Sequence, residues 1–324
     1  MNEKKINSDI GNRSEILFLY DAKDCDPNGD PFTGEPRFDE DTQKAMVSDV
    51  RLKRYIRDYL DKYESDENEE IEEKSKIVFY SSLGETQTVG GRRENLKDIL
   101  DKDDPDDLLN KCIDIRLFGC VLAEKGRNVD LTGAVQFKNM NRSINKVELK
   151  PLQNTSVMKT GEEKGRGAIA TSSQVPYALF STIGYINPKT AEINKTKQKD
   201  LELMLKALWN QINLINTRSK TGQTSRLLLI INYKDAISKI SDIESLIKLK
   251  DEKRGTKYRE FKDIQKDLDF SNFVNVIHEN KEYLKSIQYK IDNSQEYENI
   301  NSFISKLKDI KELKVEKKDF ENGK

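Results

Sequence analysis

The sequence has few of the side chains on which most catalytic mechanisms depend. Its 324 residues include one histidine, His278, and three cysteines. A single imidazole gives little scope for histidine acid–base catalysis. Three cysteines without a Cys-x-x-Cys pair predict neither a disulfide framework nor a zinc site. Composition alone therefore gives little support for an enzyme, a metal centre or a cofactor.

Long apolar runs are also absent. No stretch of about 18 apolar residues occurs, although a membrane-spanning helix needs one. Residues 1–10 are polar and lack the apolar core of a secretory signal. We therefore expect a cytoplasmic protein with no membrane partner.

Charge is balanced in total but not along the chain. Lysine and arginine number 56 and aspartate and glutamate 57, for a net charge of -1. Residues 61–110 carry 16 acidic and 7 basic side chains, whereas residues 206–234 carry 5 basic and no acidic ones. A local positive surface is compatible with a neutral total, because a polyanion responds to charges within a Debye length of about 10 Å. The alternative is that these charges are solvated faces.

The hydrophobic pattern predicts an α+β fold. Buried strands are expected for residues 15–21, 175–186 and 226–233, and amphipathic helices for 46–60 and 200–215. The order of strand, helix, strands, helix and strand suits a ferredoxin-like or RRM-like sheet with insertions. Glycines between residues 155 and 173 predict a protruding hairpin, and residues 235–324 read as mostly helical.

The loop after the first strand contains a formal calcium motif. Asp24-x-Asp26-x-Asn28-Gly29 with Glu35 matches the EF-hand pattern. A strand precedes it and Pro36 follows it, where an EF-hand has helices. A turn held by Asx side chains is the simpler interpretation. A metal held by Asp26 or Asp30 for phosphodiester cleavage is a further alternative.

Two basic segments are candidates for phosphate contacts. Arg51, Arg54 and Arg57 recur at three-residue spacing on the first helix, and guanidinium groups suit the phosphates of a nucleic-acid backbone. The alternative is a solvated helix face. The segment 218–226 is polar, cationic and free of acids, so it could hold phosphate or be an ordinary loop. From its charge we expect Arg226 to contact the phosphates of a nucleic acid.

Several motifs together resemble one family. They are Asn28-Gly-Asp-Pro31, Gly34-Glu-Pro-Arg37, the segment 47–59, Asp114-Ile-Arg-Leu-Phe-Gly119, the segment 131–137 and Arg142-Ser143. In this order they resemble the CRISPR-associated backbone subunit of type I Cascade complexes. This is the Cas-seven family of the RAMP superfamily, and the sequence is most similar to its type I-B branch.

The resemblance implies an architecture and a function. It implies a modified RRM-like palm over residues 1–234, with an inserted finger at about 61–125 and a β-hairpin thumb at about 150–175. It implies a non-catalytic ribonucleoprotein subunit of antiviral defence that polymerises head to tail along CRISPR RNA (crRNA) and presents it to target DNA. The implied partners are further copies of the chain, cap, large and small subunits, and a repeat endonuclease. Related type III subunits cut RNA with an aspartate, so a metal-dependent ribonuclease is the alternative.

The resemblance also assigns RNA contacts to particular residues. They are Asn28 and Arg37 in the first loop, Arg51, Lys53 and Arg54 on the first helix, Arg142 and Ser143 after the central strand, and Met158 and Arg166 on the thumb. The sequence departs from the family pattern at residues 38–44, which have no glycine before the helix.

Overall fold

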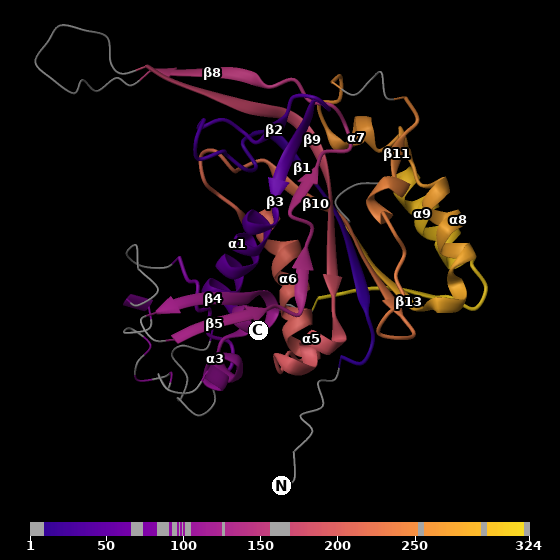
Figure 1. Cartoon of the computed structure of the whole chain (residues 1–324). Helices are drawn as coiled ribbons and strands as arrows, with labels where there is room; N and C mark the ends of the chain where they lie inside the picture. The colour runs from indigo at the N-terminus through magenta and orange to yellow at the C-terminus, as the bar shows by residue number, and fades with distance from the viewer. Residues whose placement is uncertain are drawn as a thin grey trace, which may run out of the picture.

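The computed structural model describes residues 10–65, 74–82, 91–92, 96, 98, 100, 105–124, 127–155, 169–251, 256–292 and 297–320. Its main sheet has the strand order β14-β13-β10-β1-β9-β6, and β8 pairs with β9. The strands are β1 (Ser14–Cys25), β6 (Val135–Phe137), β8 (Lys150–Thr155), β9 (Ile169–Ile186), β10 (Gln223–Tyr233), β13 (Leu284–Ile291) and β14 (Lys314–Lys317). Figure 1 shows this sheet at the centre of the molecule.

Two helices complete the ferredoxin-like motif. Helix α1 (Asp49–Tyr59) lies in the chain between β1 and β6, and helix α6 (Gln198–Leu214) lies between β9 and β10. Strand β1 pairs antiparallel with both β10 and β9, and β9 pairs antiparallel with β6. The order β10-β1-β9-β6 is that of the split βαβ sheet of RRM domains. The structure therefore confirms the predicted α+β, RRM-like fold.

Both faces of the central sheet are buried, which explains why β1 is an almost continuous apolar run. Side chains alternate between faces, so Phe18 and Tyr20 pack with α1 and α6, whereas Leu17 and Leu19 point to the opposite face. That opposite face is covered by residues after β10. The covering elements are η2 (Ile243–Leu246), β11 (Lys248–Leu249), α7 (Phe261–Ile264), β12 (Leu268–Asp269), α8 (Ser271–Glu279) and α9 (Glu298–Lys308). We call this group the C-terminal cover.

The expectation that residues 235–324 are mostly helical is wrong in part. Strand β13 pairs antiparallel with β10 along its length, and β14 continues the sheet in parallel. A short 3-10 helix, η4 (Lys281–Tyr283), leads into β13. In β13, buried Leu284 and Ile287 are separated by polar side chains, so the strand was hidden in a Lys-rich composition that also fits a helix.

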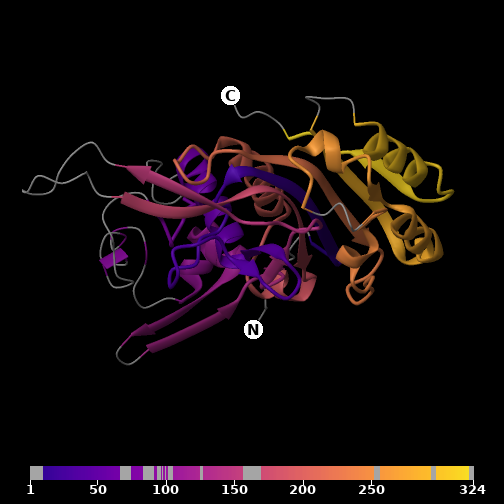
Figure 2. The same cartoon turned by 90° about the horizontal axis from the view of Figure 1, so that it is seen from above.

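The remaining elements form smaller units on one side of the sheet. They are β2 (Phe38–Asp39), β3 (Lys44–Ser48), η1 (Leu60–Glu64), α3 (Pro105–Lys111), α4 (Ile113–Phe118), β4 (Gly119–Glu124), β5 (Arg127–Thr132), β7 (Met140–Arg142) and α5 (Pro188–Ile193). The helix expected at 46–60 begins only at Asp49, since Ser48 caps it by accepting the Arg51 N–H at 3.3 Å. Gly119 ends α4 with φ of 76°, a conformation that favours glycine. Figure 2 shows the β4–β5 and β8–β9 hairpins projecting away from the C-terminal cover.

A buried arginine joins helix α4 to helix α6 and to the segment that contains Ser75. Arg116 on α4 makes a bidentate contact with Asp200 on α6, at 2.9 Å for each N–O pair, and also donates to the Ser75 carbonyl at 2.6 Å. The guanidinium is 2% exposed, so its charge is compensated entirely by these neighbours. The motif Asp114-Ile-Arg-Leu-Phe-Gly119 is thus a packing motif in this chain. Among the described residues, no helix has the length and apolar composition that a bilayer crossing requires.

Candidate nucleic-acid interface

The loop after β1 is held rigidly against the start of α1. Asn28 accepts hydrogen bonds from the Ser48 N–H at 2.8 Å and the Ser48 hydroxyl at 2.9 Å. The Tyr55 hydroxyl donates to the Pro27 carbonyl at 3.1 Å. Asn28 is 8% exposed, so in this chain its side chain organises the loop and the helix cap.

The loop carboxylates are engaged by cations of the protein itself. Asp26 forms an ion pair with Lys220 at 2.9 Å, and Asp30 forms one with Arg37 at 3.3 Å. Nowhere in the part of the chain that the structure describes do three or more metal-ligating side chains gather. The loop geometry is therefore that of the Asx-stabilised turn, in which Asp30 also accepts the Phe32 N–H at 2.9 Å.

The basic residues of α1 differ in how freely they could meet a phosphate. Lys53 pairs with Asp49 at 2.9 Å and donates to Gln136 at 3.3 Å, with its side chain 13% exposed. Arg57 pairs with buried Asp114 at 3.0 Å. Arg54 is more open, 33% exposed and paired with Asp58 on the same helix. Arg51 lies over the Tyr55 ring, 5.1 Å from its centroid, and forms no ion pair with any described residue.

The remaining predicted contacts also separate into accessible and buried groups. Arg142 on β7 is 46% exposed and pairs with Asp39 at 2.9 Å. Ser143 is 1% exposed; it donates to the Asn145 carbonyl at 2.6 Å and accepts the Ala45 N–H at 3.2 Å. Its hydroxyl therefore joins the end of β7 to β3. Met158 and Arg166, the predicted thumb contacts, lie outside the described residues, although β8 and β9 do form the paired base of a hairpin.

Arg226 lies in a different setting from the open loop cation that its charge suggests. It lies within β10, in the strand expected for residues 226–233, and its guanidinium is held between Asp21 at 3.0 Å and Asp292 at 2.9 Å. The rings of Phe261 and Tyr297 cover it, with the Phe261 centroid at 4.7 Å. The side chain is 14% exposed. Two carboxylates already neutralise this cation, so its placement is that of a structural ion pair between strands.

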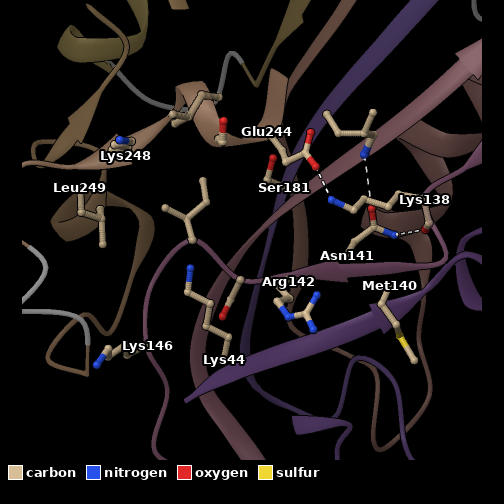
Figure 3. Close-up of a pocket in the computed structure, with 15 residues that line it drawn as sticks. Lys44, Lys138, Met140, Asn141, Arg142, Lys146, Ser181, Glu244, Lys248 and Leu249 are labelled. Atoms are coloured by element: carbon tan, nitrogen blue, oxygen red, sulfur yellow. Dashed lines mark hydrogen bonds and ion pairs between the residues drawn. The ribbon is translucent and has the colours of Figure 1, made fainter. Parts of the chain in front are cut away.

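Sequence reasoning does not identify a strongly cationic pocket in the described part of the chain. A cavity of about 380 Å³ lies between β3, β7, β9 and η2. Lysine and arginine side chains from separate segments line it, and Glu244 is its only acidic residue. Figure 3 shows these cations around the pocket: Lys44, Lys138, Arg142, Lys146 and Lys248. Lys138, Arg142 and Lys146 recur at four-residue spacing in one segment, but Lys44 and Lys248 come from distant parts of the chain, so the sequence does not indicate the whole cluster.

The charges of this pocket are only partly compensated. Lys138 pairs with Glu244, and Arg142 pairs with Asp39. Lys146 and Lys248 are exposed and form no ion pair with another described residue. The strand order and this pocket together define the class of protein. It is an RRM-like α+β protein with a positively charged pocket at the edge of its sheet.

Comparison with known proteins identifies the family. A model of the family described as CRISPR-associated protein Cas7 matches residues 12–269. A curated protein of Haloferax volcanii, CRISPR-associated protein Cas7, is 32% identical over 289 residues, which cover 79% of this chain and 81% of the relative. The chain therefore belongs to the Cas7 family.

Solved structures show the same fold at low sequence identity. A chain of a CRISPR RNA-guided surveillance complex aligns with a TM-score of 0.53 at 13% identity, covering 89% of this chain and 92% of that one. A chain of such a complex in a pre-nicking state aligns with a TM-score of 0.56 at 14% identity, covering 89% and 94%.

Proposed function

We propose that this chain is the non-catalytic backbone subunit of a type I, I-B-like, CRISPR surveillance complex and binds the guide RNA. The observation that carries the proposal is the family match over residues 12–269. That range contains every cationic side chain of the pocket at β3, β7 and η2. The function thus rests on a family assignment and on a surface within the assigned region.

The route of the RNA follows from what the fold leaves open. RRM domains stack bases on the sheet face opposite their helices. In this chain that face carries buried aliphatic side chains such as Leu19 and Leu179 and is occupied by the C-terminal cover. We therefore place the RNA backbone along the edge, from Arg51 and Arg54 on α1 past β3 to the cationic pocket. The β8–β9 hairpin is the proposed thumb, and the β4–β5 region belongs to the proposed finger.

The cationic contacts proposed here, on α1 and at the rim of the pocket, read charge and not sequence. Lysine and arginine side chains on phosphates position a nucleic acid without identifying its bases. A guide RNA differs in sequence from one complex to the next, so a backbone subunit needs this tolerance. The sequence would then be read by pairing between the guide and target DNA.

Polymerisation is the second part of the proposal. Several copies would stack head to tail along one RNA, through a heterologous interface that generates an open helix. Phe32 supports this idea, since it is 96% exposed at the tip of a loop that is otherwise fixed by hydrogen bonds. Cap, large and small subunits and a repeat endonuclease are the further partners we propose, in the cytoplasm.

Fluorescence anisotropy with two unrelated single-stranded RNAs tests the RNA surface. The double variant Lys146→Glu/Lys248→Glu should weaken binding to both by about tenfold or more and reduce the salt dependence. Lys189→Glu/Lys199→Glu, which reverses two exposed lysines on α5 and α6, is the matched control and should bind nearly as the wild type does. Equal losses in both variants would contradict the assigned surface.

Incubation of labelled RNA with the protein and Mg²⁺ tests the absence of catalysis. The RNA should remain intact. Regularly spaced cuts would instead establish the alternative, a metal-dependent ribonuclease, and Asp26→Asn and Asp30→Asn would then show which loop carboxylate acts.

A further inference from the structure

The interior of the cationic pocket differs from its rim. Its walls include apolar side chains on opposite sides: Met140, Ile144, Ile183, Ile247 and Leu249. Its volume of about 380 Å³ lies in the range of about 300–1,000 Å³ that is usual for small-molecule sites. A surface that only met phosphates would not need an apolar interior.

Two polar atoms at this pocket have no partner among the described residues. Ser181 is 8% exposed, and its hydroxyl is buried without a hydrogen bond. One carboxylate oxygen of Glu244, Oε2, is also buried and unbonded, while Oε1 contacts the Lys138 ammonium group. Buried polar atoms without partners are costly and uncommon. A ligand that donates an N–H to Glu244 and reaches the Ser181 hydroxyl would satisfy both.

The position of Ser181 explains how a ligand reaches the sheet. Ser181 lies on β9 opposite Leu19 of β1, and alternate residues of a strand share a face. It therefore belongs to the face that the C-terminal cover otherwise buries. In Figure 3, Ser181 and Glu244 lie on one side of the pocket, and Lys44 and Lys146 lie on the other. The pocket is an opening between the cover and β7 onto the sheet.

We propose that this pocket holds one nucleotide whose base carries an exocyclic amino group. The base lies between the apolar walls, its amino group donates to Glu244, and its phosphate lies against the rim cations. Adenine, guanine and cytosine have such an amino group, whereas the N3–H donor of uracil is flanked by two carbonyl oxygens, which the Glu244 carboxylate repels. An acidic peptide fits less well, because its carboxylate would approach the Glu244 carboxylate.

The nucleotide has two possible sources with the same chemistry. It is either one unit of a bound single-stranded RNA, which rests on the proposed function, or a free nucleoside monophosphate, which does not. Calorimetry with AMP, UMP and inorganic phosphate measures the pocket alone. Anisotropy with a labelled oligoadenylate measures RNA binding separately, so the two proposals can fail independently.

The wild type should bind AMP at least about tenfold more tightly than inorganic phosphate, and several-fold more tightly than UMP. Ser181→Leu, which fills the pocket, should reduce AMP affinity by about tenfold or more. Because a filled pocket could disturb folding, Glu244→Gln is the second variant. It keeps the size of the side chain and should bring AMP and UMP affinities close together.

The source is distinguished by oligoadenylate binding. If an RNA unit occupies the pocket, Ser181→Leu and Glu244→Gln weaken oligoadenylate binding along with AMP binding. If free nucleotides alone occupy it, AMP binding falls and oligoadenylate binding does not. The proposal is overturned if AMP binds wild type no better than inorganic phosphate or UMP, or binds Ser181→Leu as well as wild type, even where RNA binding is strong.

Discussion

Arg226 and buried Asp21 form a partly buried ion pair, 3.0 Å from nitrogen to oxygen, that joins the neighbouring strands β10 and β1. Asp21 is 3% exposed, and its burial raises the pKa of its carboxyl group although the Arg226 charge acts to lower it. Asp292 and Tyr297 contact the same guanidinium from the far side, at 2.9 and 2.8 Å. This arginine therefore connects the central sheet to the C-terminal residues that cover it.

Replacing Arg226 should reduce stability and leave the RNA surface intact. Arg226→Ala leaves two carboxylates without their shared cation, at a cost of about 3–5 kcal/mol in the free energy of unfolding. Urea unfolding of the variant measures this cost. Lys189→Ala removes an exposed cation on α5 and should leave the unfolding midpoint unchanged. A stable Arg226→Ala protein with weak RNA binding would instead support Arg226 as an RNA contact.

The basic residues of α1 should affect RNA binding in proportion to their exposure. Arg51→Ala and Arg54→Ala should each reduce the binding free energy by roughly that of one phosphate contact. Each should also make the slope of log K against log salt concentration shallower by about one unit. Lys53→Ala should affect RNA binding less, because Lys53 already contacts Asp49 and Gln136. Anisotropy over a series of salt concentrations measures all three variants. A larger loss for Lys53→Ala than for Arg51→Ala would contradict this division.

A buried glutamate should make stability depend on pH. Glu15 is 1% exposed, accepts the Tyr233 hydroxyl at 2.5 Å, and leaves Oε1 unbonded. Its burial raises the pKa of the carboxyl group. The folded state therefore keeps this proton to a higher pH than the unfolded state does. The stabilisation from protonation is present at low pH and is lost as pH rises through the raised pKa.

Glu15→Gln removes the charge and keeps an acceptor for Tyr233. We expect a higher melting temperature than wild type at about pH 8 and a flatter profile down to about pH 4. Thermal unfolding at a series of pH values checks both. The exposed Glu279→Gln on α8 is the control. If the melting temperature of Glu15→Gln depends on pH as that of the wild type does, Glu15 does not titrate in this way.

Phe32 should act in assembly and not in folding. Phe32→Ser should leave the melting temperature unchanged, since the side chain is 96% exposed, and should reduce the number of copies that bind one long RNA. Phe32→Leu preserves an apolar side chain and should assemble more nearly as wild type does. Mass photometry of each variant on one RNA reads the number of copies. Full assembly by Phe32→Ser would remove Phe32 from the interface.

The sequence could predict the fold because its core elements carry strong local patterns. The apolar run of β1 and the helical period of α6 are visible without tertiary information. Strand β13 could not be predicted, because it depends on pairing with β10 and has polar side chains between its apolar ones. The basic residues carried the least information, since Arg226 and Lys53 look like surface cations and only packing reveals their carboxylate partners.

The cationic pocket could not be predicted from the sequence either. Lys146 and Lys248 are about a hundred residues apart in the chain, and only the fold brings β7 and η2 to one cavity. The resemblance located Arg142 because it lies within a family motif. It gave no indication of Ser181 or Glu244, whose unbonded atoms are visible only in three dimensions.

The central claim is that several copies of this chain bind along one RNA and that their number is set by the length of the RNA and not by its sequence. Native mass spectrometry with unrelated RNAs of increasing length tests it most directly. We predict that the number of bound copies rises in regular steps with RNA length, and that the steps are the same for every sequence. One copy on RNAs of all lengths, or steps that occur with only one sequence, would contradict the account.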